Sequence, residues 1–150
     1  MSAISPDTTA TAERLYFAIY ERMAAKSDYL QPDNYRQMLP EAVIVAGVVS
    51  IVTGILSGIS AGFLSKVGEN IADQAGKLLK KLKSEKHKPE ELVAIIAGAV
   101  PILQVSVTNW DEISACIALE LTRQGMHFPV SQELARDIAE GVRQALGAPR

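Results

Sequence analysis

The chain has 150 residues, of which 48% are hydrophobic and 21% are charged, and its formal net charge is −2. This composition suits one globular domain with a sizeable core and excludes an intrinsically disordered chain. The small negative net charge disfavours a general nucleic-acid binder, because phosphate contacts require a basic excess.

The N-terminal part predicts a polar leader followed by an amphipathic helix. Residues 1–11 are expected to form a frayed leader, and short oxygen-bearing side chains between Asp7 and Thr11 suit the start of a helix. Apolar residues then recur at helical spacing on one face, which therefore needs an apolar surface to cover it. They are Ala12, Leu15, Tyr16, Ile19, Tyr20 and Met23. Residues 26–40 contain prolines and aspartates typical of a loop.

The segment 42–65 contains no charged residue. Pro40 and Glu41 before it suit the first turn of a helix. As one helix the segment would span roughly 36 Å, enough to cross a bilayer core of about 30 Å. We therefore predict that it forms the central helix of the fold. The apolar stripe in residues 67–82 is predicted to be helical too, and a bend near Gly68 would allow it to continue the same helix.

Small residues recur every four positions within the uncharged segment. This small-residue ladder consists of Ala46, Ser50, Gly54, Gly58 and Gly62. The spacing places them along one helix face, so that another helix can approach closely. Each glycine costs about 1 kcal/mol in a helix relative to alanine, and either close helix packing or insertion into lipid would account for this cost. Periodicity does not distinguish a buried helix from a spanning one, so both interpretations stay open.

A run of lysines occupies the basic segment 77–88. It consists of Lys77, Lys80, Lys81, Lys83, Lys86 and Lys88. A solvated helix end is the ordinary interpretation of such a run, and the lysines suit the negative end of a helix. The run also lies between two apolar stretches, 42–65 and 92–107. That order favours a surface that contacts anionic lipid or an acidic partner.

The rest of the chain predicts further helices. Pro89 opens one of them, and Pro101 should kink or end it, which leaves 102–108 as a short extended connection. Residues 109–147 then predict a pair of helices. Asn109 begins the first, which Gly125 ends, and Ser131 and Gly147 are expected to bound the second. The predicted buried faces hold Trp110, Ile113, Ile117 and Leu121, and Leu134, Ile138, Val142 and Ala145.

The sequence contains no recognisable constellation of catalytic residues. His87 and His127 lack a second ligand at helical spacing, so no metal site is expected. Cys116 is the only cysteine and falls within a helix, where a buried inert thiol is the common case. We therefore predict that the chain is not an enzyme and uses no cofactor. The single cysteine, together with an N-terminus unlike a secretory signal, favours the cytoplasm.

The ladder residues Ala46, Ser50, Gly54, Gly58 and Gly62 carry a resemblance to a known class of domain. The chain resembles the glycine-zipper helices of membrane-perforating domains, the HeLo-like and Bell-type effector domains of microbial cell-death and immunity systems. The resemblance covers residues 40–84 and is one of composition and spacing. In those domains the membrane-active helix often lies at the extreme N-terminus, whereas here residues 1–41 precede it. The resemblance implies a helix that inserts into membranes.

Together these patterns predict a single all-α domain over residues 1–150, a bundle of about five helices around the segment 42–65. The first functional hypothesis is a membrane-active effector, whose shielded apolar segment is released to self-associate and form pores in anionic membranes. It implies a cytoplasmic protein with conditional membrane association. The alternative is a soluble protein-interaction or oligomerisation module, in which the ladder packs helices within or between chains. A constitutive membrane protein is the third hypothesis. Expected partners are a second copy, anionic lipid or another protein, and not nucleic acid.

Overall fold

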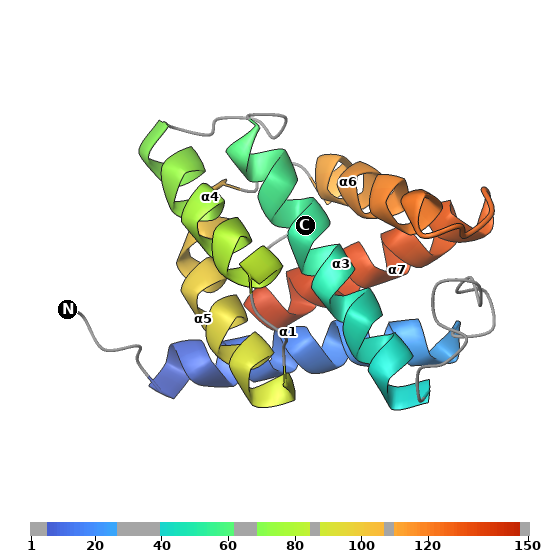
Figure 1. Cartoon of the computed structure of the whole chain (residues 1–150), viewed down its shortest axis with the longest axis horizontal. Coiled ribbons are helices and arrows are strands. Elements are labelled where there is room, and N and C mark those ends of the chain that lie inside the picture. Colours follow the sequence, from blue (N-terminus) through green and yellow to red (C-terminus); the bar gives the residue numbers. More distant parts are fainter. Residues whose placement is uncertain (1–5, 27–39, 62–68, 85–87, 107–109, 148–150) are drawn as a thin grey trace.

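The computed structural model describes residues 6–26, 40–61, 69–84, 88–106 and 110–147, and every regular element in these ranges is an α-helix. The prediction of an all-α fold is confirmed for this part of the chain (Figure 1). The helices are α1 (Pro6–Ala25), α3 (Pro40–Ser60), α4 (Glu69–Ser84), α5 (Pro89–Ser106), α6 (Trp110–Arg123) and α7 (Val130–Leu146).

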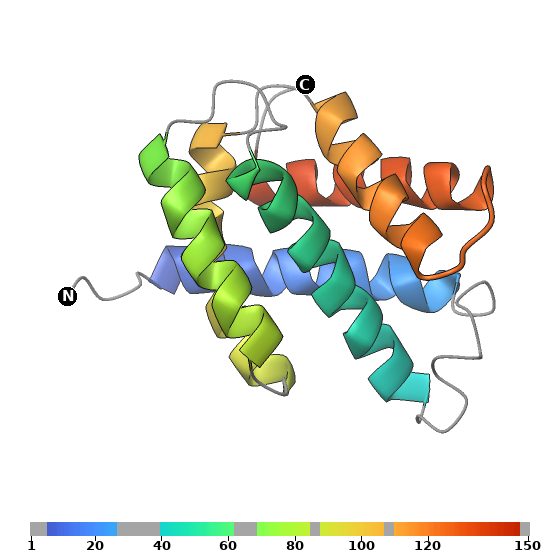
Figure 2. The same cartoon turned by 45° about the horizontal axis from the view of Figure 1, so that its top comes forward.

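The six helices form a bundle in which α1 and α7 lie side by side and run in opposite directions (Figures 1 and 2). Helix α3 crosses over α1 and also packs against α4, α5 and α6. Helix α5 packs against α1 and α4, and α6 packs against α7. An ion pair of 3.2 Å between Arg22 Nε and Asp137 Oδ1 joins α1 to α7 across their exposed edge.

Helix α1 buries the face that its periodicity predicts. Leu15, Ile19 and Met23 are fully buried, and they belong to one apolar cluster to which all six helices contribute. Full burial of one such side chain stabilises the fold by about 1.5–3 kcal/mol. The helix begins at Pro6, which suits a first helical position, so residues 6–11 are helical and not a frayed leader. Residues 1–5 and most of the predicted loop 26–40 lie outside the described residues.

The uncharged segment does not continue into α4 as one bent helix. Helix α3 ends at Ser60, and α4 runs back alongside it in the opposite direction (Figures 1 and 2). The reason is that α4 has an apolar face of its own, with Ala75, Leu79 and Leu82 buried, and this face must lie against the bundle. The described residues therefore contain six helices, and the expectation of about five is not confirmed.

Pro101 does not end or interrupt the helix that contains it. Helix α5 continues to Ser106, so the expected extended connection over 102–108 is wrong for residues 102–106. A proline inside a helix costs about 3 kcal/mol. The next two residues, Ile102 and Leu103, are buried in the core, and their burial is worth about 1.5–3 kcal/mol each. The gain offsets the cost, and the ring of Pro101 itself is exposed.

The C-terminal helix pair has most of the predicted buried positions and both predicted C-terminal ends. Trp110 and Ala145 are half-buried, and Asn109 lies outside the described residues. Helix α6 buries Ile113, Ile117 and Leu121 completely. Helix α7 buries Leu134, Ile138 and Val142, each of which is at most 2% exposed. Gly125 takes a positive φ of 97° at the end of α6. The amide of Gly125 donates to Thr122, and that of Met126 donates to Leu121, as in a Schellman motif. Gly147, with φ 68°, ends α7 in the same left-handed region.

Ser131 does not cap α7. The helix begins at Val130, its N-cap is Pro129, and no side chain caps the first turn. Ser131 is instead fully buried within that first turn, and its Oγ lies 3.1 Å from Thr122 Oγ1 on α6. The Thr122 hydroxyl also lies 2.8 Å from the carbonyl oxygen of Ala118, to which it donates. Ser131 therefore connects two helices, and its cap-like position in the sequence is misleading.

Candidate functional site

Four of the five ladder residues lie on α3, and Gly62 lies outside the described residues. Ala46, Ser50 and Gly54 are half-buried, and Gly58 is buried. The large apolar side chains of α3 enter the core cluster on another side of the helix: Val48, Ile51, Val52, Ile55, Leu56 and Ile59. The ladder is therefore placed where neighbouring helices of the same chain can cover it.

Gly54 is a ladder residue that lies close to another helix. A Cβ atom at this position would lie 3.1 Å from Glu120 Cβ and 3.6 Å from the carbonyl oxygen of Cys116, both on α6. Glu120 Cβ is fixed to the backbone and cannot swing away as the end of a long side chain could. The two helices thus approach each other at a distance that glycine permits and a larger residue would increase.

A second glycine of α3, Gly47, lies against the end of a flexible side chain of α1. A Cβ atom at position 47 would overlap the terminal methyl group of Met23, which is fully buried beneath it. Because the Met23 methyl group can move aside, Gly54 is the stronger case of a glycine required for close helix packing. At Gly54 the helix-propensity cost of about 1 kcal/mol has an explanation inside the chain, without lipid.

No helix in the described residues is both long enough and apolar enough to cross a membrane. Of the predicted spanning segment, 42–65, residues 42–60 lie in α3, Ala61 follows in a turn, and residues 62–65 lie outside the described ranges.

The lysine run forms an exposed surface. We define the lysine face by its described members, Lys77, Lys80, Lys81, Lys83 and Lys88, all of which are exposed, whereas Lys86 lies outside the described residues. The first four lie on α4, whose opposite face buries Leu79 and Leu82. The acidic residues of α4, Glu69 and Asp73, lie nearer its start. Positive charge is thus concentrated at one end of the helix, where it also suits the helix dipole.

Cys116 and the two histidines are the residues outside the lysine face that the sequence singled out for their chemistry. Cys116 is half-buried, and its burial, followed by the charge of Glu112, raises the pKa of the thiol above its ordinary value. The thiol therefore stays protonated at neutral pH, which disfavours a nucleophilic role. His127 is exposed, and His87 lies outside the described residues. Within the part of the chain that the structure describes, no three His, Cys, Asp or Glu side chains are grouped as a metal site would require.

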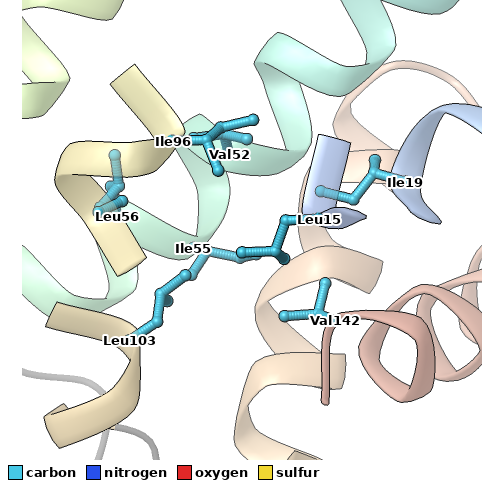
Figure 3. Close-up of a pocket in the computed structure, with 9 residues that line it drawn as sticks. Leu15, Ile19, Val52, Ile55, Leu56, Ile96, Leu103 and Val142 are labelled. Carbon is cyan, nitrogen blue, oxygen red and sulfur yellow. The ribbon is translucent and has the colours of Figure 1, made fainter. Parts of the chain in front are cut away.

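A small apolar cavity lies at the centre of the bundle, between α1, α3, α5 and α7 (Figure 3). Its volume is about 20 Å³, and Leu15, Ile55, Leu103 and Val142 are among the side chains that converge on it. This volume could hold one water molecule, but a cavity without polar partners stays dry. The cavity is a packing defect of the core and is too small for an organic ligand.

One surface feature was not predicted from the sequence. Phe17 on α1 is 55% exposed, and its ring packs edge-on against Tyr16, with ring centroids 5.4 Å apart. It lies in a groove between α1 and α5, the α1/α5 groove, which encloses about 570 Å³. The sequence does contain a signal for this exposure. Phe17 lies outside the apolar face of its helix, and Glu13 and Glu21 flank it at a spacing of four residues.

Comparisons of the chain with protein-family models, with curated proteins and with solved structures give no match.

Proposed function

We propose that this chain is a protein-interaction module, a helical domain whose lysine face binds an acidic partner protein. The observation that carries the proposal is the contrast between the two features that the sequence singles out. Within the ladder, Gly54 packs against α6 of the same chain, whereas the lysine face is exposed. The feature available for a partner is therefore the basic one.

The lysine face is suited to an acidic partner because its four lysines on α4 lie together, although Glu85 separates them from Lys88 in the sequence. No acidic residue interrupts positions 77–84, although the whole chain has a net charge of −2. Exposed ion pairs contribute only about 0.2–1 kcal/mol each, so several lysines must act together. Such contacts mainly accelerate association and select partners by charge, and salt screens them over about 10 Å at 0.1 M. We expect binding that is moderate in affinity and strongly dependent on salt.

The experiment measures binding of fluorescently labelled poly-glutamate, a probe for acidic protein surfaces, to the full chain at two salt concentrations. In the test variant Lys80, Lys81 and Lys83 are all replaced by Gln. These side chains are exposed, so the variant should fold like the parent. Binding of poly-glutamate should weaken in this variant, and most of its salt dependence should disappear.

A matched control removes the same number of positive charges elsewhere. It replaces Arg14, Arg123 and Arg136, which are exposed residues of α1, α6 and α7, by Gln. The control variant should bind poly-glutamate nearly as well as the parent. Equal losses in the two variants would show that binding follows net charge and would contradict a defined lysine face.

The second candidate function is the membrane-active effector, and one observation favours it. Helix α4, which carries most of the lysine face, packs directly against α3, which has no charged residue after Glu41. Contact of the lysines with anionic lipid, worth about 1 kcal/mol for each residue near the surface, would thus bring α3 to the same surface. Release of α3 would additionally require its separation from α1, α5 and α6.

Dye-filled vesicles distinguish the two candidates. The parent chain is added to phosphatidylcholine vesicles with and without phosphatidylserine. Leakage that requires phosphatidylserine, and that is lost in the triple lysine variant and in a folded Gly54→Leu variant, would favour the effector. A parent that binds poly-glutamate and never releases the dye would leave the interaction module as the function.

A further inference from the structure

The α1/α5 groove is a second surface, opposite in charge to the lysine face. Its floor is apolar and includes Val93, Ala94 and Ala97 of α5. Phe17 stands at its α1 side and also borders a neighbouring groove between α1 and α7. The volume of about 570 Å³ is large enough for side chains of a partner.

Phe17 has the properties of an anchoring residue for a partner. More than half of its surface is exposed, although a phenylalanine contributes most when it is buried. Its ring is held edge-on by Tyr16, which is itself buried, so little ordering would be needed on binding. Aromatic residues that are already ordered and become covered by a partner often supply much of the binding free energy.

The charged side chains that line the groove are both acidic. Glu13 comes from α1 and Glu90 from α5, and no lysine or arginine is among the described residues that line it. Carboxylates on both helices select a partner with Lys or Arg beside its apolar residues, and they repel an acidic one. A groove between two helices is a recurrent site for an amphipathic helix, which inserts residues at positions i, i+3, i+4 and i+7.

From this combination we infer that the α1/α5 groove binds a basic amphipathic helix of a partner protein, with Phe17 as the apolar anchor. A second copy of this chain is not the occupant. Its own basic amphipathic helix, α4, has its apolar residues Ala75, Leu79 and Leu82 buried in its bundle and cannot present them without unfolding. This inference does not rest on the proposed role of the lysine face.

The test uses the full chain and a synthetic helical peptide with Leu at positions i, i+3, i+4 and i+7 and Lys elsewhere. Binding is followed by the anisotropy of a label on the peptide. Phe17→Ala should weaken binding by about tenfold or more, as expected for loss of an anchor. Leu119→Ala is the matched control, because Leu119 is a 60% exposed apolar residue on α6, and it should leave binding unchanged.

The charge requirement is tested separately. Replacement of both Glu13 and Glu90 by Gln should weaken binding several-fold at low salt and reduce its salt dependence. A second peptide, with Glu in place of Lys, should not bind. The triple lysine variant used above should bind the basic peptide at least as well as the parent does. This result distinguishes failure of the groove proposal from failure of the lysine-face proposal.

Several outcomes would overturn the inference. One is the absence of saturable binding, and another is equal binding of the basic and acidic peptides. A third is an equal effect of Phe17→Ala and Leu119→Ala, which would place the peptide elsewhere on the surface. A fourth is a parent chain that dimerises in light-scattering measurements and becomes monomeric after Phe17→Ala, which would assign the groove to a second copy.

Discussion

Replacement of Gly54 by alanine should destabilise the fold, whereas the same change at Gly76 should stabilise it. Both glycines are half-buried helical residues, and alanine removes a helix-propensity cost of about 1 kcal/mol at each. The sites differ in what the new methyl group meets. At position 76 its nearest neighbour is Ser60 Oγ at 3.5 Å, an ordinary contact, but at position 54 it is Glu120 Cβ at 3.1 Å.

The expected magnitudes follow from these contacts. Gly76→Ala should gain about 1 kcal/mol. Gly54→Ala has the same gain but must move α3 and α6 apart, and overpacking of this kind costs about 1–3 kcal/mol. The free energies of unfolding of the two variants should therefore differ by about 1–3 kcal/mol. For a chain of this size, 1 kcal/mol corresponds to a Tm shift of about 2–4 °C.

Urea and thermal unfolding, followed by circular dichroism at a helix wavelength, measure the difference directly. Gly54→Leu extends the series and should lose more stability than Gly54→Ala, because three further carbon atoms must fit against α6. An equal rise in Tm for both alanine variants would refute the reasoning. It would mean that α6 packs loosely against the small-residue face of α3, as the release of α3 into lipid would require.

Three further predictions concern other contacts. The thiol of Cys116 should react slowly with iodoacetamide at neutral pH, because burial raises its pKa. As the pH rises beyond the ordinary thiol value of 9.0, the unfolded chain ionises this thiol more readily than the folded chain does, so the free energy of unfolding should fall in pH-dependent unfolding measurements. Gly141→Ala would displace the Arg22 guanidinium, since its Cζ lies 2.7 Å from the new Cβ position. Arg22→Ala should therefore lower the free energy of unfolding less in the Gly141→Ala variant than in the parent, and strict additivity of the two changes would contradict this. Thr122→Val should lower the free energy of unfolding by about 1–3 kcal/mol in urea titrations, because it removes a hydroxyl in contact with the buried Ser131, and an unchanged midpoint would contradict that estimate.

The sequence is sufficient to predict faces and ends that depend on local periodicity. The buried stripes of α1, α6 and α7 follow from apolar residues spaced three and four apart, as Ile113, Ile117 and Leu121 show. Gly125 and Gly147 end their helices because only glycine readily takes a positive φ there. The exposure of the lysine face follows in the same way from the apolar face on the other side of α4.

The features that the sequence did not predict depend on tertiary contacts. Pro101 lies inside a helix because burial of the residues after it outweighs the local cost, which no local pattern reveals. Ser131 resembles a cap in the sequence, yet its hydroxyl contacts a residue of another helix. The α1/α5 groove combines residues near positions 13–17 with residues near 89–97, so it exists only once α1 and α5 have packed.

The pairing of α1 with α7 has a consequence for how the chain acquires its structure. Arg22 and Asp137 are 115 positions apart, so the contact between their helices can form only after nearly the whole chain is available. Contacts of such long sequence separation slow folding, because a long loop must be closed before they contribute. At a synthesis rate of about 5–20 residues per second, α7 would leave the ribosome several seconds after α1. Over that interval the part of the α1 surface that α7 covers would be accessible to chaperones that bind exposed apolar segments.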